Sequence, residues 1–137
     1  MTDTNVQTAQ VLYPALRYAD AHAAIRWLCE AFGFEKQKVY EAPDGTVAHA
    51  QLVLNGGMLM LGSAREGGVY PVKTPNQLGG VTGSIYVYVA DPDAHCARAR
   101  AAGATIAIEP RNTEYGSREY AASDCEGHWW SFGTYHP

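Results

Sequence analysis

Hydrophobic and polar residues follow two patterns along the chain, the alternation typical of strands and the spacing typical of helices. Both patterns occur in each half. In the first half, residues 11–20 (VLYPALRYAD) alternate with the period of two that is typical of a half-buried strand. Residues 21–34 (AHAAIRWLCEAFGF) carry apolar side chains at helical spacing. Asp20 is placed as the N-cap of this helix and Gly33 as its stop. The pattern therefore predicts a strand followed by an amphipathic helix.

Three further strands are predicted after this helix. They are EKQKVYEA (35–42), TVAHAQLVL (46–54) and MLMLGS (58–63). The glycine-containing turns PDG and NGG separate them, and such turns are typical of hairpins. The first half therefore has the order βαβββ.

The second half repeats this order. A strand is predicted in GSIYVYVAD, and a helix follows in PDAHCARARAAGA. Pro92 suits the first helical position after Asp91, and Gly103 ends the helix. The last three strands are predicted in TIAIEP, REYAAS and HWWSFGTY, with turns around Tyr115-Gly116 and at DCEG. The fold class is therefore α+β, with two βαβββ modules in tandem.

The two halves are also similar when the chain is aligned with itself at an offset of 71 residues. Asp20 then matches Asp91, and Gly62 matches Gly133. These matches recur at regular places over two halves of equal length, which indicates an internal duplication. We predict one domain made of modules at about 11–63 and 82–135. The segment between them, 64–81, is rich in Gly and Pro and is interpreted as a linker, with a flap over a site as the alternative.

Composition restricts the possible partners. The 137 residues carry a formal charge of −4, so the basic surface typical of nucleic-acid-binding proteins is not expected. No apolar run approaches the length of a membrane span, and the N-terminus lacks the features of a signal peptide. The three cysteines do not have metal-like spacing. We therefore predict a cytoplasmic protein that binds neither nucleic acid nor membrane.

Several segments resemble the vicinal oxygen chelate superfamily, which includes glyoxalase I, extradiol dioxygenases and bleomycin resistance proteins. The segments are RYADAHAAIRWLCEAFGF, DGTVAHAQL, MLMLG and YGSREYAASDCEGHWWSFG. They resemble the strand-Asp-helix opening of that family and its closing turn, over almost the whole chain from Tyr13 onward. The resemblance implies that each module forms a curved sheet. Two such sheets would then form a cup around a cavity, either within one chain or across a dimer.

The metal-dependent enzymes of this family hold their ion with residues on the first and last strands of each module. Carried over by position, these places are Tyr13, Met60, Ser84 and Ser131. Catalytic divalent ions prefer His nitrogens and carboxylate oxygens, so a thioether and neutral hydroxyls are poor replacements. We therefore predict no bound metal and no cofactor.

His49 is the histidine of greatest interest. It lies in the middle of a predicted strand with Gln51 on the same face, and the offset of 71 makes Tyr120 its counterpart. A strand histidine is often a hydrogen-bonded structural residue. Alternatively, a side chain that titrates near neutral pH would suit proton transfer or a polar ligand contact inside the cup. His49 resembles a histidine of the metal-free, PhnB-like branch of the superfamily, a resemblance that implies no role for it.

A candidate ligand surface follows from the alternation of strand faces, if Tyr13 and Ser84 face the cup. The candidate ligand-binding residues are Tyr13, Arg17, His49, Gln51, Met60, Ser84, Tyr86, Tyr88, Tyr120, Trp129 and Ser131. Tyrosine and tryptophan suit an aromatic or planar ligand, and Arg17 suits a carboxylate, phosphate or enolate. The alternative is that these tyrosines only fill a sheet or a dimer contact.

Other reactive groups give little support for catalysis. The sequence contains neither a nucleophile elbow nor a phosphate-binding glycine loop. Glu119 is expected at the surface or rim, because it alternates with Arg118 and Tyr120. His22 and His95 are expected to face solvent near the starts of the two helices.

Two classes of function therefore follow. The first is a binding protein, similar to bleomycin resistance proteins, that holds a small aromatic or cationic molecule and forms a homodimer. The second is a lyase, isomerase or dioxygenase of the same superfamily, with a displaced metal or with His49 as a base. A third, an interaction module without a cavity, stays open.

Overall fold

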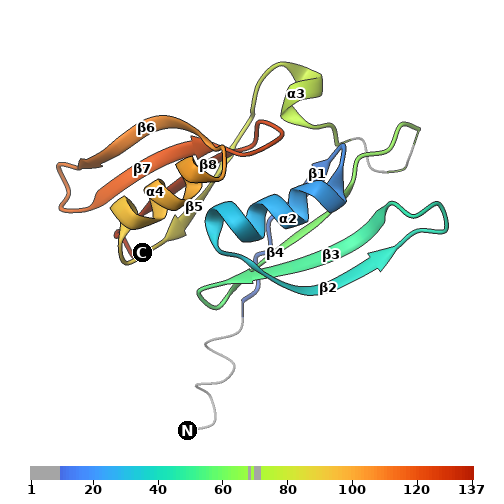
Figure 1. Ribbon diagram of the computed structural model, residues 1–137, viewed down its shortest axis with the longest axis horizontal. Coiled ribbons are helices and arrows are strands. Elements are labelled where there is room, and N and C mark those ends of the chain that lie inside the picture. The colour runs from blue at the N-terminus through green and yellow to red at the C-terminus, as the bar shows by residue number, and fades with distance from the viewer. Residues whose placement is uncertain (1–9, 68, 70–71) are drawn as a thin grey trace, which may run out of the picture.

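The computed structural model describes residues 10–67, 69 and 72–137, and these form two βαβββ units in tandem (Figure 1). The first unit comprises β1 (Ala15–Tyr18), α2 (Ala21–Phe32), β2 (Glu35–Glu41), β3 (Val47–Leu54) and β4 (Gly57–Ser63). Its strands form a sheet in the order β1-β4-β3-β2, in which only the β1–β4 pair is parallel.

The second unit has the same topology. It comprises β5 (Ser84–Tyr88), α4 (Pro92–Ala101), β6 (Thr105–Asn112), β7 (Arg118–Ser123) and β8 (Trp129–Gly133). The sheet order is β5-β8-β7-β6, and again only the first pair, β5–β8, is parallel. The predicted α+β fold with two βαβββ modules is therefore confirmed.

The helix boundaries follow from local chemistry. The Asp20 side chain accepts a hydrogen bond from the backbone N–H of Ala23 at 3.1 Å, and the Asp91 side chain accepts one from Ala94 at the same distance. Gly33 ends α2 with a φ of 90°, in the left-handed region that favours glycine. The N-caps and the first helix stop were therefore predictable from sequence.

In the described part of the segment between the two units lies a short helix, α3 (Pro75–Leu78). Thr74 caps it with its hydroxyl, and the Gln77 side chain bonds back to the Thr74 backbone, so the two residues form a capping box. The sequence analysis did not predict this helix, because four residues are too few for a helical period.

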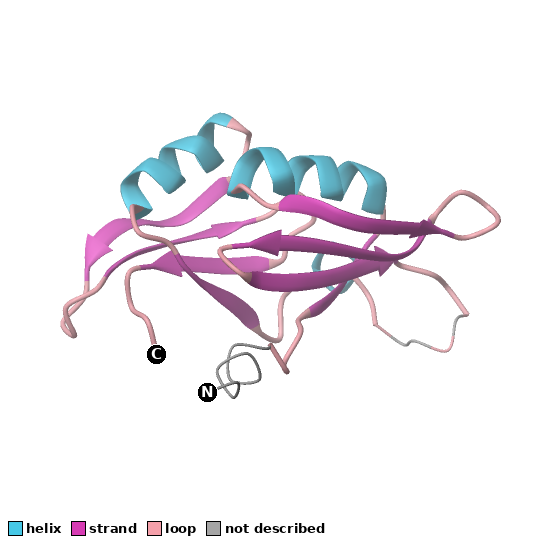
Figure 2. Cartoon of the chain, turned by 90° about the horizontal axis from the view of Figure 1, so that it is seen from below, coloured by secondary structure: helices cyan, strands magenta, loops and turns pink. Residues whose placement is uncertain are grey.

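Helices α2 and α4 lie side by side on the same side of the strands (Figure 2). Three side chains connect them: Trp27 donates to the carbonyl of Ala102 at 2.9 Å, Arg98 donates to the carbonyls of Cys29 and Glu30, and His95 contacts the carbonyl of Phe32. The opposite side of the two sheets, which we call the open face, is the one from which α2 and α4 are absent.

A single hydrophobic core runs beneath both helices. Phe32 of α2, fully buried, packs against Trp130 and Phe132 of β8, with ring centroids 5.4 and 4.7 Å apart. Core side chains of the first unit, such as Leu28 and Leu52, belong to the same buried cluster. The two units therefore bury their apolar surfaces together rather than separately.

The turn before β8 forms a second connection between the units. Asp124 accepts hydrogen bonds from the Tyr18 hydroxyl at 2.6 Å and from the Trp130 indole N–H at 3.0 Å. Glu126 accepts from the backbone N–H groups of Ala19 and Asp20, just before α2. The DCEG sequence therefore joins the second unit to the end of β1.

Candidate functional site

Most of the predicted ligand-binding residues lie on the open face. Leu16, Leu59 and Leu61 pack into the core beneath the helices, and the residues that alternate with them face the other way. In the first sheet the predicted residues on the open face are Arg17, His49, Gln51 and Met60, with Tyr13 just before β1. In the second sheet they are Ser84, Tyr86, Tyr88, Trp129 and Ser131.

Tyr120 is the exception, and its expected position was wrong. It is 1% exposed and lies on the helix side of β7, where its hydroxyl is 2.6 Å from Nδ1 of His95. Its ring stacks on Phe132 at a centroid distance of 5.1 Å. Tyr120 is therefore a core residue.

The error arises from the length of one turn. In the first unit, Leu54 pairs with Gly57, so the β3–β4 turn consists of Asn55 and Gly56 alone. In the second unit, the backbone of Asp124 bonds to that of His128, so three residues separate the paired positions. One extra residue in a turn shifts β7 by one position, and such a shift moves every side chain to the other face.

Glu119 therefore takes the place that was assigned to Tyr120. It pairs with Gly133 of β8, as His49 occupies the matching place beside Gly62 in the first unit. Glu119 was expected at the surface or rim, on the face away from the cup, whereas its half-buried side chain lies on the open face. The signal that could have found it is the difference between the turns NG and CEG, read before the halves were aligned.

His49 forms contacts with two neighbours on the open face. Its Nε2 lies 3.0 Å from the side-chain oxygen of Gln51, and its ring stacks on Tyr40 at a centroid distance of 6.2 Å. Gln51 in turn donates to the side chain of Gln37 at 2.6 Å. The half-buried imidazole is thus held in place, whether it contacts a ligand or only supports the sheet.

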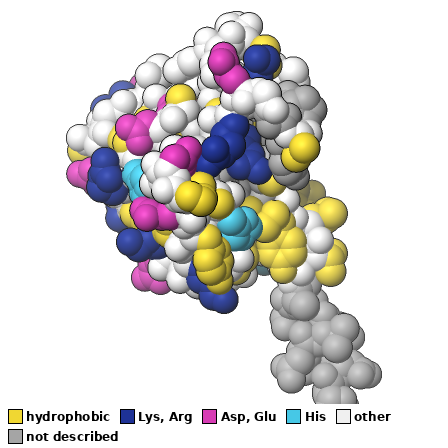
Figure 3. All heavy atoms as spheres, turned by 90° about the vertical axis from the view of Figure 1, so that its right-hand side faces the viewer, with side chains coloured by type: hydrophobic (Ala, Val, Ile, Leu, Met, Phe, Trp, Pro, Cys, Tyr) yellow, Lys and Arg dark blue, Asp and Glu magenta, His cyan; other side chains and the backbone are white. Residues whose placement is uncertain are grey.

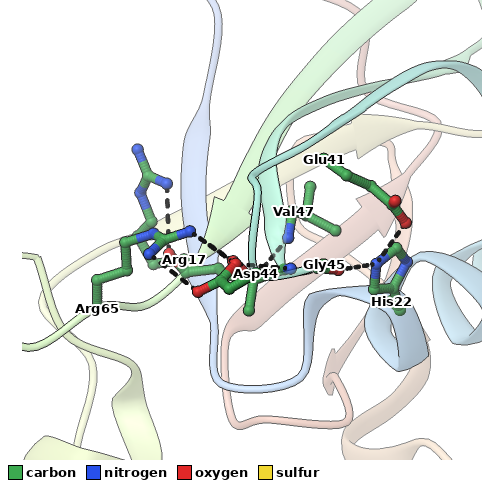
Figure 4. Close-up of polar contacts among 9 residues, drawn as sticks. Arg17, His22, Glu41, Asp44, Gly45, Val47 and Arg65 are labelled. Carbon is green, nitrogen blue, oxygen red and sulfur yellow. Dashed lines mark hydrogen bonds and ion pairs between the residues drawn. The ribbon is translucent and has the colours of Figure 1, made fainter.

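The guanidinium of Arg17 lies over Gly62 of β4 and reaches the backbone of that strand (Figure 4). Its Nη1 is 3.5 Å from the carbonyl oxygen of Ser63. A methyl group at Gly62 would collide with the guanidinium, so only glycine leaves space for this arrangement. Arg65 lies nearby with its ion-pair partner Asp44, 3.5 Å away.

These charges belong to the end of the molecule that carries the β2–β3 hairpin. Figure 3 shows basic and acidic side chains close together on this end, with hydrophobic side chains beside them. The Arg65–Asp44 pair is exposed, and such a pair contributes little to stability. Arg17 does not belong to this pair. Its contribution to a site would come from its position above Gly62.

The second sheet presents an aromatic open face. The Tyr86 hydroxyl donates to the carbonyl of Tyr135 at 2.6 Å, and Tyr88 packs near His136 with ring centroids 4.8 Å apart. Tyr86 is 37% exposed and Tyr88 39%, although large aromatic side chains gain free energy on burial. This surface is therefore available to a partner or a ligand.

Two cavities lie between residues of the two units, and Pro14 and Ile85 line both. The first has a volume of about 260 Å³ and includes Tyr86 and Tyr88 in its wall. The second has a volume of about 500 Å³ and is bounded by the 72–84 segment and Trp129. The first is slightly below the size range of small-molecule sites, and the second lies within it.

The four positions carried over from the metal-dependent enzymes do not form a suitable ligand set. Met60 pairs with Ala15, and Ser131 pairs with Tyr86, while the hydroxyl of Tyr13 donates to the carbonyl of Gln10. Thioether and neutral hydroxyl groups do not fit a catalytic divalent ion. Within residues 10–67, 69 and 72–137, no three His, Cys, Asp or Glu side chains gather as a possible metal site.

His95 was expected to face solvent, but the structure places its ring against other residues. Its Nδ1 contacts the Tyr120 hydroxyl, and its Nε2 lies 2.8 Å from the carbonyl oxygen of Phe32. A neutral ring satisfies both contacts by accepting at one nitrogen and donating at the other. Burial lowers the pKa of His95, because the charged form loses hydration.

We expect His95 to make the protein less stable in mild acid. The unfolded chain takes up this proton near pH 6.5, whereas the folded chain resists it, so stability falls as the pH decreases below that value. Urea unfolding of the wild type and His95→Gln, compared between pH 8 and pH 5, measures the effect. The variant should lose less stability over this range, and His136→Gln, in the exposed C-terminal segment, should behave as the wild type. An equal change in the free energy of unfolding between pH 8 and pH 5 for all three proteins would contradict the prediction.

No helix within the described ranges is long and apolar enough to cross a bilayer.

Comparison with known proteins gives a consistent assignment. The family model of the Glyoxalase/Bleomycin resistance protein/Dioxygenase superfamily matches residues 10–132. An uncharacterized protein of Mycobacterium bovis, Mb0911c, is 36% identical over 132 residues, which cover 94% of this chain and 84% of that protein.

Solved structures agree with this assignment. TioX from Micromonospora sp. ML1 is 36% identical, with a TM-score of 0.71 over 90% of this chain and 94% of TioX. A glyoxylase/bleomycin resistance protein/dioxygenase domain from Frankia sp. EAN1pec, at 19% identity, shows the same fold with a TM-score of 0.70 over 93% of this chain and 98% of that domain. The chain therefore belongs to the glyoxalase/bleomycin resistance protein/dioxygenase superfamily.

Proposed function

We propose that this protein binds a small aromatic or cationic molecule on the open face of its sheets and acts as a homodimer. The proposal includes membership of the metal-free, PhnB-like branch of the superfamily. Its principal support is the aromatic surface of the second sheet, formed by the exposed Tyr86 and Tyr88 together with the half-buried Trp129.

The arrangement of this surface favours a planar ligand. Tyr86 and Tyr88 are two residues apart on one strand, so their side chains lie on the same face. Trp129, on the neighbouring strand, pairs with Ser84 on that face. Aromatic rings with a polar tip provide a flat contact area together with hydrogen bonds, which suits an aromatic molecule.

The edges of the two sheets support the dimer. β1 and β5 are each the last strand of their sheet, so each leaves one row of backbone groups unpaired by a further strand of the described chain. Val11 and Leu12, just before β1, are each 83% exposed. A second copy that covers these edges would bury the apolar residues and extend the two cavities.

A ligand screen tests the proposal directly. We expect aromatic compounds that raise the melting temperature of the wild type to lose this effect in Tyr86→Ala and Trp129→Ala, because each change removes aromatic contact area. Arg26→Ala, on the exposed side of α2, is the control and should respond as the wild type. His49→Ala shows whether the site extends to the first sheet. Compounds that stabilise every variant equally would contradict the proposed surface.

The dimer and the alternative of a metal-dependent enzyme need separate measurements. Light scattering with size-exclusion chromatography should give the mass of two chains. Elemental analysis of protein purified without chelator should give far less than one Zn, Ni, Mn or Fe per chain. A stoichiometric metal would favour the lyase, isomerase or dioxygenase alternative and count against this proposal.

A further inference from the structure

The carboxylate of Glu119 is fixed in position on the open face. Its Oε1 accepts a hydrogen bond from the Tyr115 hydroxyl at 2.8 Å, and its Oε2 accepts one from the Ser117 hydroxyl at 3.0 Å. The side chain crosses Gly133, where a methyl group would collide with Glu119 Cγ. The turn at Gly116, with a φ of 85°, brings Tyr115 back over the strand.

The carboxylate of Glu119 has no ion-pair partner within the described residues, whether Lys, Arg or His. Arg111 is its cross-strand neighbour on β6, but this side chain is exposed and does not pair with the carboxylate. Two hydroxyl donors orient the carboxylate without cancelling its charge.

Three tyrosines surround this carboxylate. The rings of Tyr115 and Tyr135 meet edge to face at a centroid distance of 5.8 Å and an interplanar angle of 84°. Tyr86 contacts Tyr135 at 6.5 Å, and its hydroxyl lies over Gly133 beside Glu119. All three rings are exposed, Tyr115 to 63% and Tyr135 to 49%. We name Glu119, Tyr86, Tyr115 and Tyr135 the tyrosine cage.

The electrostatics of the tyrosine cage agree with this geometry. The hydrogen bond to Glu119 raises the pKa of Tyr115. Burial and the negative charge of Glu119 raise the pKa of Tyr86. A fixed carboxylate beside the electron-rich faces of tyrosine rings attracts a cation by charge and by cation–π interaction.

We propose that the tyrosine cage is a subsite for an organic cation, such as a quaternary ammonium or protonated amine carried by the ligand. The inference rests on the proposed function, because it assigns a charge to one part of the molecule that the open face binds. A quaternary ammonium group fits better than a metal ion, because three of the four side chains are aromatic and only one is a carboxylate.

Two probes of equal shape test the charge. The first is 4-(trimethylammonio)phenol, and the second is the neutral 4-tert-butylphenol. Isothermal titration calorimetry at low salt measures both dissociation constants for the full chain. We expect the cation to bind the wild type about tenfold more tightly than the neutral isostere. In Glu119→Gln, which keeps the shape of the side chain, the two constants should become equal within about threefold.

Two further variants make the test specific. Arg111→Ala removes the nearest cation on β6, so the cationic probe should bind more tightly and the neutral probe should be unaffected. Glu109→Gln changes an exposed glutamate that pairs with Arg100, and neither constant should change. Thermal unfolding of each variant shows that the fold is retained.

The outcomes separate this inference from the proposed function. Equal affinities of the wild type for the two probes, with no effect of Glu119→Gln, would overturn the cation subsite and leave aromatic binding intact. Failure of both probes to bind at 10 mM would also overturn it, and the compound screen would then decide the proposed function by itself. A preference for the cation that persists in Glu119→Gln would show that another group recognises the charge.

Discussion

Asp124→Ala should lower the free energy of unfolding by about 4 kcal/mol. The carboxylate is 7% exposed and accepts hydrogen bonds from the Tyr18 hydroxyl and the Trp130 indole, both of which are fully buried. It also accepts from the backbone N–H groups of Glu126 and His128. The methyl group of alanine cannot accept a hydrogen bond, so these donors would stay in the interior without their acceptor. Each buried unsatisfied group lowers the free energy of unfolding by about 1–3 kcal/mol.

Urea unfolding followed by tryptophan fluorescence measures this loss. Tyr18→Phe removes a single donor and should cost only about 1 kcal/mol. Asp44→Ala removes an exposed aspartate with an ion pair and hydrogen bonds of its own, and should lower the stability far less than Asp124→Ala does. An Asp124→Ala protein as stable as Asp44→Ala would show that this connection does not hold the two units together.

Phe32→Ala should destabilise both units at once, by about 4 kcal/mol. Phe32 belongs to α2 of the first unit, yet its ring packs against Trp130 and Phe132 of the second. Truncation would create a cavity at the place where the two sheets share their core, and neighbouring groups refill such a cavity only in part. We therefore expect one cooperative transition for the wild type and for the variant.

Far-UV circular dichroism and tryptophan fluorescence, recorded on the same samples, test this prediction. The two signals should change together if both units unfold in one step. Trp27 lies in the first unit and Trp129 and Trp130 lie in the second, so the fluorescence reports on both. Phe32→Leu, which keeps most of the volume, should cost about 1 kcal/mol, and it remains informative if the alanine variant does not fold. Tyr40→Ala is the exposed aromatic control. Two separate transitions would show that the units fold independently.

The two units share a topology but present different chemistry on the open face. Beside Gly62 the first unit has Arg17 and His49, and beside Gly133 the second has Tyr88 and Glu119. One side of a ligand could therefore meet a guanidinium and the other a carboxylate among tyrosines. This asymmetry arises from the side chains that occupy corresponding places, and the longer turn before β8 decides that Glu119 takes the place on β7.

Much of the fold could be predicted from the sequence because its signals are local. Alternation of apolar residues located the strands, and Asp20 and Asp91 marked the helix starts through side chains that cap the backbone a few residues away. The open-face positions of Arg17, Tyr86 and Trp129 followed from the period of two along a single strand.

The positions of Tyr120, Glu119 and His95 could not be predicted in the same way. The face of β7 depends on its register with β8, and the register was set by a turn one residue longer than its counterpart. His95 seemed exposed because its partners, Tyr120 and the carbonyl of Phe32, are distant in sequence. The contacts around Glu119 also depend on a turn and on the C-terminal segment.

The sequence by itself determined the two βαβββ units, their helix caps and the alternating faces of their first strands, because each depends on residues within a few positions of one another. Only the tertiary structure decided that the units share one core, that Asp124 joins them, and that Glu119 rather than Tyr120 reaches the open face. These features depend on strand register and on contacts between distant segments. A shift of one residue in the register of a strand would exchange its buried and exposed side chains.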